Sequence, residues 1–301
     1  MDRPIPPSIT ADASSTDLGR PPLRVIVLAG RGGGAGAGGS PDPLARRFGQ
    51  QHKCLVPLAG RPLAAHVLQT AASHPAVESL AIAIEREAFD SLFDVLSQIP
   101  GRGIVKLVEA RRNLVDSVMA AAQGWDGALL VTTADHALLT AGSIDRMIAA
   151  LDRAEAVFAM APRDAVLAVH PQDRRRFHAF ADGAFAACNL YAASGPEALR
   201  AAEAFRGGGQ FARRRWRVAR AVGMVDLVLL WARAVTLAEA AERLSRRFAL
   251  KVAPVVLDDG SQAVDVDDDD SHALAESLLL APAPSRPGAA FTAASAPAWA
   301  G

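Results

Sequence analysis

The chain has little cysteine, no net charge and no sorting signal. Its 301 residues include two cysteines, Cys54 and Cys188, which stand far apart and lack the spacing of a metal site. They predict reduced thiols in a cytoplasmic protein and exclude a disulfide framework. Lysine plus arginine number 32, as do aspartate plus glutamate, so no overall field attracts nucleic acid or an acidic membrane. The N-terminus lacks the charged-then-apolar layout of a signal peptide.

Long hydrophobic runs are also missing. The most apolar window, residues 222–235, is too short to cross a bilayer and contains Asp226 and Arg233. Half of the residues are nevertheless hydrophobic and 21% are charged, which is the composition of a globular protein with a substantial core. No transmembrane segment is therefore predicted.

Composition divides the chain into three parts. Residues 1–22 are rich in Pro, Ser, Thr and Asp, and residues 281–301 in Ala, Pro and Ser, so both predict disordered tails. Residues 23–280 predict one folded domain. Within it, residues 213–248 predict a helical insertion of two helices, the second of which starts with a capping box formed by Thr236 and Glu239.

Short aliphatic runs alternate with segments of helical periodicity. The predicted strands are LRVIVLAG, SLAIAI, GIVKLVEA, GALLVTT, AACNLYAA, KVAPVVL and AVDV. The predicted helices between and after them include RPLAAHVLQTAASH, EAFDSLFDVLSQI, NLVDSVMAAAQGW and SHALAESLLL. Continuous apolar strands that alternate with helices indicate a sheet covered on both faces. The sequence therefore predicts a Rossmann-like three-layer α/β/α sandwich with a mixed, mostly parallel sheet.

A glycine-rich loop, LAGRGGGAGAGGS, follows the first predicted strand. Residues 34–39 match the dinucleotide pattern G-x-G-x-x-G, but they start late, and no acidic residue closes a second strand about 20 positions on. No Gly-Lys-Ser/Thr ends the run, so a Walker P-loop is excluded. The LAGRG part lies at the carboxyl end of a buried strand, where backbone N–H groups can cradle a triphosphate. Residues 34–39 are then either a cover over the triphosphate or a flexible spacer.

Two charged residues are candidates for the same edge of the sheet. Lys53, in HKCLVPLAGRPL, is a solvated surface residue or, if its loop folds back, a cation that offsets charge on phosphates. Asp135, in VTTADHALL, follows a buried strand and either caps the next segment or binds Mg²⁺. The neighbouring His136 is interpreted as structural.

A second acidic cluster, AVDVDDDDS, begins at residue 263. The aspartates at 268–270 predict an exposed helix N-terminus, where negative charge is favourable. Asp265 and Asp267 alternate with valines along the predicted strand and therefore face one side. One of them would share a metal ion with Asp135.

Taken in order, these motifs resemble those of the MobA-like nucleotidyltransferases. The family pattern is an L-A-x-G loop, a lysine in K-x-L-x-x-x-x-G-x-P, an aspartate that ends a central strand and a late D-x-D. The resemblance covers residues 23–280. It implies a GT-A-like fold and Mg²⁺-dependent transfer of NMP from an NTP to a phosphorylated small-molecule acceptor, with release of pyrophosphate.

The resemblance also implies roles on the nucleotide side of the site. The nucleotide-binding candidates are Leu28, Ala29, Gly30, Arg31, Lys53, Asn113 and Ser117. The first three would act through the main chain, and Lys53 would neutralise the phosphates. Asn113 and Ser117 would lie beside the base and ribose or, alternatively, cap a helix. The family's loop arginine has three candidates here, Arg31, Arg46 and Arg47.

The remaining roles concern catalysis, metal and acceptor. The resemblance makes Lys53 and Asp135 catalytic and assigns the metal to Asp135 and Asp267, with Asp265 as the alternative. Gly183 and Asn189, in DGAFAACNLYA, would line the acceptor pocket, although a buried asparagine can equally satisfy backbone groups. The arginines at 174–176 are candidates for an acceptor phosphate.

Two departures from the family pattern keep other functions open. The glycine run is unusually long, and the late motif continues with aspartates and a serine where Thr-Pro-Glu-Asp is usual, so its register is uncertain. One alternative is a GT-A glycosyltransferase that consumes a nucleotide sugar. The other is a non-catalytic nucleotide-binding regulator. The sequence does not predict the base, the acceptor or whether the protein is a homo-oligomer.

Overall fold

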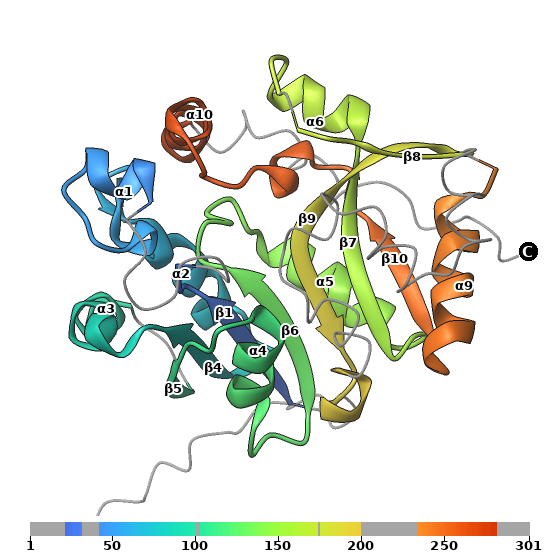
Figure 1. The fold of residues 1–301 in the computed structure, drawn as a ribbon, viewed down its shortest axis with the longest axis horizontal. Helices are drawn as coiled ribbons and strands as arrows, with labels where there is room; N and C mark the ends of the chain where they lie inside the picture. The colour runs from blue at the N-terminus through green and yellow to red at the C-terminus, as the bar shows by residue number, and fades with distance from the viewer. Residues whose placement is uncertain (1–21, 32–41, 100–102, 174, 200–233, 282–301) are drawn as a thin grey trace, which may run out of the picture.

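The computed structural model describes residues 22–31, 42–99, 103–173, 175–199 and 234–281. The central sheet has the strand order β10-β7-β9-β6-β1-β4-β5, and β8 pairs with β9 (Figure 1). All neighbouring pairs are parallel except those that include β9. The strands of this sheet are β1 (Leu23–Leu28), β4 (Val77–Ile84), β5 (Ile104–Glu109), β6 (Ala128–Thr133), β7 (Ala156–Pro162), β8 (His178–Phe180), β9 (Gly183–Ala193) and β10 (Val252–Val256).

Helices cover both faces of the sheet, and a two-stranded hairpin lies outside it (Figure 1). The α-helices are α1 (Pro43–Arg47), α2 (Leu63–Ser73), α3 (Phe89–Ser97), α4 (Leu114–Ala122), α5 (Ala141–Ala150), α6 (Arg163–Val169), α9 (Leu237–Phe248) and α10 (Asp269–Leu280). The 3-10 helices are η1 (Lys53–Leu55), η2 (Arg86–Ala88) and η5 (Gly260–Ala263), and the hairpin consists of β2 (Pro57–Leu58) and β3 (Arg61–Pro62).

Successive residues of β1 enter two different cores, because side chains alternate across a strand. Val25 and Val27 pack in the core that contains residues of α2, α3 and α5. Ile26 packs in a second core with residues of α4. The side chains of Val25, Ile26 and Val27 are all fully buried, as the continuous aliphatic run predicts. The predicted three-layer α/β/α sandwich with a mixed, mostly parallel sheet is confirmed.

The strand order reverses beside β1. From β1 the chain crosses to β4 and β5 on one side and then returns to β6 on the other side. Ligands of open α/β sheets bind at the carboxyl ends of strands where the order reverses in this way. The carboxyl ends of β1 and β6 are therefore the place to look for the site.

One predicted strand is wrong. Residues 263–266 form no sheet strand; Ala263 ends η5, and the residues that follow are extended without a ladder partner. The helix start at Thr236 is correct, since its hydroxyl and the Glu239 carboxylate form the predicted capping box. Residues 34–39, the first predicted helix of the insertion (213–233) and both predicted tails lie outside the described residues, so the domain boundaries stay predictions.

Other sequence expectations concern membranes and thiols. No helix in the described part of the chain is both long and apolar enough to cross a bilayer. Cys54 and Cys188 are both free and buried. Burial raises the pKa of each thiol to about 12, so both are protonated at neutral pH.

Candidate active site at the carboxyl edge of the sheet

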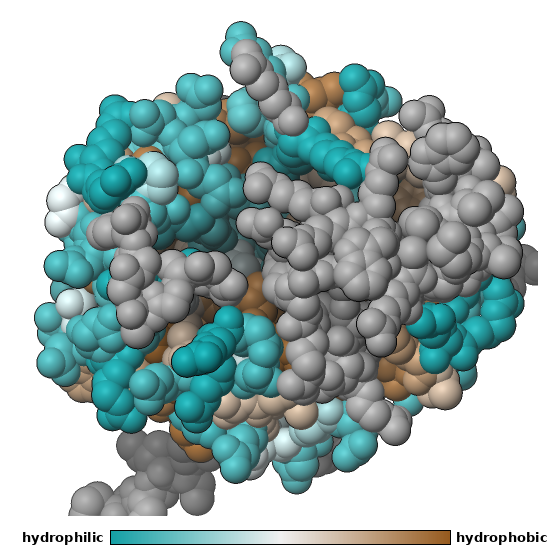
Figure 2. Space-filling view, in the orientation of Figure 1, coloured by the Kyte–Doolittle hydropathy of each residue, from teal (hydrophilic) through white to brown (hydrophobic). Residues whose placement is uncertain are grey.

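The loops after β1 and β6 lie against each other at the switch point of the sheet. The Ala134 N–H donates to the Leu28 carbonyl oxygen at 2.9 Å, and the Ala29 N–H donates to the Ala83 carbonyl at 2.9 Å. The predicted nucleotide cradle and the Asp135 turn are thus parts of one edge. Figure 2, in the orientation of Figure 1, shows a hollow with hydrophilic walls beside α1 and α10.

Gly30 lies in tight surroundings. A Cβ at this position would lie 3.1 Å from the Ala110 Cβ and 3.2 Å from Glu85 Oε1, which is closer than most Cβ contacts. The Arg31 N–H donates to the same Glu85 oxygen at 2.8 Å. Glu85 therefore fixes the end of the LAGR segment. This glycine permits close packing against protein atoms, whether or not a phosphate also approaches it.

Arg31 is directed into the protein. Its Nη2 lies 3.3 Å from His52 Nε2 and 3.7 Å from Glu87 Oε1. His52 is buried, and its Nδ1 lies 3.3 Å from Glu85 Oε2. Burial alone would raise the pKa of Glu85, but hydrogen bonds from His52 and from the Arg31 N–H lower it to about 2. The sequence gives no signal for this network, which joins the start of the glycine-rich loop to His52, the residue before Lys53.

The other two arginine candidates lie on α1. Arg46 is exposed, and Arg47 pairs with Asp269 in the first turn of α10. Arg31 is thus engaged by His52 and Glu87 and Arg47 by Asp269, and a phosphate contact by any of the three arginines stays a prediction.

The K-x-L-x-x-x-x-G-x-P motif forms η1 and the β2–β3 hairpin. Ala59 and Gly60 have φ of 47° and 77°, so both residues of the two-residue turn are left-handed, as a type I′ turn requires. Helix α10 fixes the hairpin: Glu276 Oε1 accepts from the Ala59 N–H at 3.0 Å, and His272 Nε2 donates to the Pro57 carbonyl at 2.8 Å. The motif thus sets the position of Lys53 at its start.

Lys53 joins the two acidic segments. Its Nζ lies 2.5 Å from Asp135 Oδ2 and 2.5 Å from Asp267 Oδ1, residues 82 and 214 positions away in the sequence. Burial would lower the pKa of Lys53, but the two carboxylates outweigh it and raise the pKa above its ordinary value. Burial likewise opposes ionisation of Asp135, whose pKa is nevertheless lowered by Lys53. Three of the predicted site residues therefore meet in one ionised cluster.

The late aspartates approach Asp135 along an extended segment. The Val266 N–H donates to the Asp135 carbonyl at 3.1 Å, which places Asp265 and Asp267 on either side of this contact. Val266 is fully buried. Asp268 is the N-cap of α10 and forms a capping box with Ser271. Asp267 therefore contacts Lys53, and Asp268 belongs to the helix.

Asp265 lies deeper and has a neutral donor as its partner. Asn189 Nδ2 donates to Asp265 Oδ2 at 2.7 Å. Burial, followed by the charges of Asp135 and Asp267, raises the pKa of Asp265 to about 8. Asn189 has a φ of 46° at an irregularity in the pairing of β9 with β7, so the strand bends where this side chain enters the site.

Gln262 is a site-building residue that the sequence does not reveal. Its side chain is fully buried. Its Nε2 donates to the Leu138 carbonyl at 2.7 Å, and its Oε1 accepts from Ser143 Oγ at 2.7 Å. One amide thereby connects the segment after Asp135 with the segment before Asp265. No local pattern predicts contacts between residues more than a hundred positions apart.

Other candidates have structural partners or lie elsewhere. Asn113 is the N-cap of α4 and accepts from the Asp116 N–H at 2.8 Å, and Ser117 Oγ accepts from the Arg111 N–H at 2.8 Å. Asn113 therefore caps a helix, as the alternative interpretation describes, whereas Ser117 lies within α4 and binds the main chain of Arg111. Gly183 lies in the β8–β9 turn, six residues or about 20 Å along the strand from Asn189. These two do not line one small pocket through direct contact.

Of the three adjacent arginines, residue 174 lies outside the described residues. Arg175 is engaged within the protein: it pairs with Asp173 at 2.5 Å and donates to the Ala263 carbonyl. This arginine therefore supports the η5 segment.

The acidic cluster fits a divalent cation that also binds phosphates. Asp135 Oδ1 and Asp265 Oδ1 are buried and have no hydrogen-bond partner. Hard carboxylate oxygens of this kind suit Mg²⁺, which takes one or two carboxylates together with substrate phosphates. Within the described ranges, no three His, Cys, Asp or Glu side chains form a ready-made metal cage. The carboxylates converge instead on the Lys53 ammonium.

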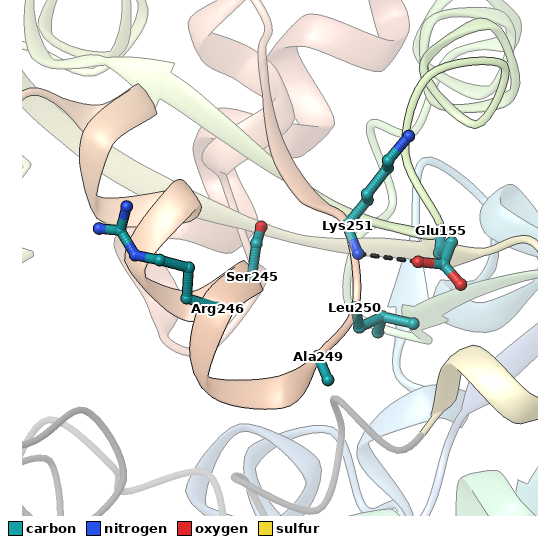
Figure 3. A pocket seen from close by; sticks show the side chains of 6 residues that line it. All are labelled: Glu155, Ser245, Arg246, Ala249, Leu250 and Lys251. Carbon is teal, nitrogen blue, oxygen red and sulfur yellow. Dashed lines mark hydrogen bonds between the residues drawn. The ribbon is translucent and has the colours of Figure 1, made fainter.

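A separate surface depression lies at the amino edge of the sheet. Its volume is about 300 Å³, and it is lined by Glu155, Ser245, Arg246, Ala249, Leu250 and Lys251 (Figure 3). The Lys251 N–H donates to Glu155 Oε2 at 2.9 Å, and Ser245 Oγ accepts from the Val252 N–H at 2.8 Å. These polar groups join α9 to its neighbouring strands and leave no charged cluster comparable to that at Lys53.

Sequence comparisons identify one family model and one partial relative. A model described as the MobA-like NTP transferase domain matches residues 26–221. The 2-C-methyl-D-erythritol 4-phosphate cytidylyltransferase of Shewanella amazonensis is 34% identical over 101 residues, which cover 32% of this chain and 41% of that protein. The match therefore spans less than half of that relative.

Solved structures show the same fold. A hypothetical transferase from Thermus thermophilus superposes with a TM-score of 0.67 and 24% identity, covering 84% of this chain and 99% of the other. The 4-diphosphocytidyl-2C-methyl-D-erythritol synthase of Anaerococcus prevotii gives a TM-score of 0.51 and 12% identity, covering 86% and 98%. At these identities the similarity shows the fold alone.

Proposed function

The chain belongs to the MobA-like NTP transferase family, and from this membership and its site we propose that it transfers NMP from an NTP to a phosphorylated small-molecule acceptor, releasing pyrophosphate. The observation that carries the proposal is the meeting of Lys53, Asp135 and Asp267 at the carboxyl edge of the sheet. A fixed cation and paired carboxylates at such an edge are the groups that phosphate chemistry requires.

In this proposal the protein supplies charge and position. Lys53 neutralises the phosphates of the NTP, and the main chain of Leu28, Ala29 and Gly30 lines the nucleotide. An acceptor phosphate oxygen attacks the α-phosphorus in line, and pyrophosphate leaves. No protein nucleophile takes part, in keeping with two buried cysteines whose thiols are protonated at neutral pH.

Asp135 and Asp267 would hold Mg²⁺ in this reaction, with Asp265 as a further ligand or as a neighbour that sets their position. When bound, the metal offsets negative charge on the phosphates. Two observations support this assignment: Asp135 Oδ1 and Asp265 Oδ1 are buried without hydrogen-bond partners, and Asp267 meets Asp135 at the Lys53 ammonium. On the acceptor side we assign Asn189, which reaches Asp265, and keep Gly183 as a more distant candidate.

CTP is the first nucleotide to test. The partial relative from Shewanella amazonensis is a cytidylyltransferase, and its similarity to this chain favours the same base here. The acceptor class is a small molecule that carries a phosphate.

The test is a pyrophosphate-release assay with each of the four NTPs, Mg²⁺ and a panel of phosphorylated acceptors. We expect pyrophosphate with one NTP and one acceptor class. Lys251→Met changes an exposed lysine at the opposite edge and should keep the wild-type rate, whereas Lys53→Met should not. Release of free NDP from a nucleotide sugar would instead indicate a glycosyltransferase, and NTP binding without turnover a regulator.

A further inference from the structure

Lys53 has a position that a phosphate-binding lysine does not need. Its ammonium lies between two carboxylates, 2.5 Å from Asp135 Oδ2 and 2.5 Å from Asp267 Oδ1. These are the same two side chains that would hold the divalent cation. An ammonium and a metal ion cannot share this place, because they would repel at contact distance.

The cluster has more negative groups than the lysine can satisfy. Asp265 interacts electrostatically with both Asp135 and Asp267, and its Oδ1 is buried without a hydrogen-bond partner. Asp135 Oδ1 is likewise buried without a hydrogen-bond partner. The ammonium thus contacts two of the three acidic side chains, the third is bound by the neutral Asn189 amide, and two buried acceptor atoms of the cluster remain unused.

We propose that Lys53 is the resident counter-ion of this site: its ammonium occupies the cation position between Asp135 and Asp267 until an incoming triphosphate draws it away. The divalent cation then binds well only together with the nucleotide, and poorly by itself. This inference rests on the proposed function, since it requires an NTP that attracts the lysine.

The backbone around Lys53 allows this exchange. The adjacent Cys54 is buried, and the Leu55 N–H donates to the His52 carbonyl at 3.1 Å, so the main chain is fixed. The Lys53 side chain is 21% exposed, and its four-carbon chain is flexible. The ammonium can therefore move while the backbone stays in place. An ammonium that moves from carboxylates to phosphates remains paired throughout.

A purely structural salt bridge is the competing explanation. In that case Lys53 would hold the Asp267 segment against the loop after β6. Other contacts already do this, namely the Val266 N–H bond to the Asp135 carbonyl and the Gln262 amide bonds to Leu138 and Ser143. The segment therefore keeps its position when the lysine charge is removed, and the vacated place becomes available to a metal ion.

The experiment measures Mn²⁺ binding without nucleotide, by titration calorimetry or by the EPR signal of free Mn²⁺. We expect Lys53→Met to bind Mn²⁺ about tenfold or more tightly than wild type, because a competing positive charge is gone. Lys53→Arg keeps the charge and Lys251→Met removes a remote one, so both should bind as wild type does. Adding Asp267→Asn to Lys53→Met should abolish the gain.

Equal or weaker Mn²⁺ binding by Lys53→Met would overturn the proposal. Should this variant be too unstable for titration, its melting temperature serves instead: Mn²⁺ should raise it more than it raises that of wild type. NTP binding, measured in parallel, keeps the two hypotheses apart. A wild-type protein that binds no NTP refutes the proposed function, whereas the Mn²⁺ comparison decides the counter-ion role.

Discussion

The sheet carries a buried or half-buried cation at each of its two edges, and their surroundings differ. Arg24, at the amino end of β1, is 5% exposed, and its partners are neutral: Ser79 Oγ at 3.0 Å, the Ala121 carbonyl at 3.0 Å, the Gln123 carbonyl at 3.5 Å and the face of Trp125 at 4.6 Å. Lys53, at the carboxyl edge, has two carboxylate partners, and buried oxygens beside it have none.

This difference is the basis for interpreting Arg24 as a structural cation and for proposing Lys53 as a functional one. The Arg24 guanidinium satisfies carbonyls at the end of α4, which any helix leaves unpaired, and its own donors are used in doing so. The Lys53 cluster has surplus negative charge and unsatisfied acceptors, which are costly in a protein interior unless a ligand uses them. Both sites bury a positive charge. They differ in the groups around it, which are neutral at Arg24 and negatively charged at Lys53.

The largest expected effect is on turnover. Lys53→Met and Asp135→Asn should each lower kcat by about 100- to 1000-fold, the usual loss when a group that stabilises developing charge is removed. Arg24→Met, assayed under conditions where it is folded, should keep the wild-type kcat. Steady-state pyrophosphate release measures all three. The comparison fails if Arg24→Met loses as much activity as Lys53→Met.

The next effect is on stability. Arg24→Met leaves the Ala121 carbonyl and Ser79 without their donor and should lower the free energy of unfolding by about 2 to 3 kcal/mol. Arg146→Met, which loses an exposed pair with Asp258 and an exposed hydrogen bond to the Val256 carbonyl, should change it by less than about 1 kcal/mol. Urea denaturation measures both values. Equal losses from the two variants would mean that the Arg24 contacts do not stabilise the fold as described.

Asn189 tests whether the acidic cluster depends on its neutral donor. Asn189→Gly keeps the left-handed backbone but removes the amide, and it should lower kcat by about tenfold through the lost hydrogen bond to Asp265. Asn189→Ala should have the same kcat as Asn189→Gly. Its free energy of unfolding should be about 1 kcal/mol lower than that of Asn189→Gly, because alanine is strained at this φ. A kcat that is unchanged in both variants would remove Asn189 from the site.

The smallest effect concerns Glu85 and pH. Its folded pKa of about 2 lies below its ordinary value of 4.5, so the ionised carboxylate stabilises the fold above about pH 4.5, and this contribution is lost as the pH falls toward 2. Glu85→Gln should be less stable than wild type by about 1 kcal/mol at pH 7, after allowance for solvent screening. The urea midpoints of wild type and Glu85→Gln, measured at several pH values, should become equal at acidic pH. A difference that does not vary with pH would contradict the lowered pKa.

The sequence predicts the residues of the charged cluster because each stands in a local pattern. Asp135 follows an aliphatic run that can only be a buried strand, and Lys53 opens a motif whose glycine and proline form a hairpin. The position of these side chains follows from chain topology, since parallel strands present their carboxyl ends at one edge.

Contacts between distant segments are beyond such patterns. Asp265 and Asp267 both interact with other members of the cluster, but the predicted strand is wrong because no neighbouring strand pairs with it in the described structure. The buried Gln262 amide and the network of His52 with Glu85 have no periodicity and no motif. They become visible only when the fold brings their partners together.

The most direct test of the central claim is a crystal structure of the protein with its NTP and Mn²⁺, analysed by anomalous difference density. The account predicts a Mn²⁺ peak at the carboxylates of Asp135 and Asp267, with the Lys53 ammonium moved onto the phosphates. A bound nucleotide whose phosphates and Mn²⁺ lie away from this edge, with Lys53 still between the two aspartates, would contradict it.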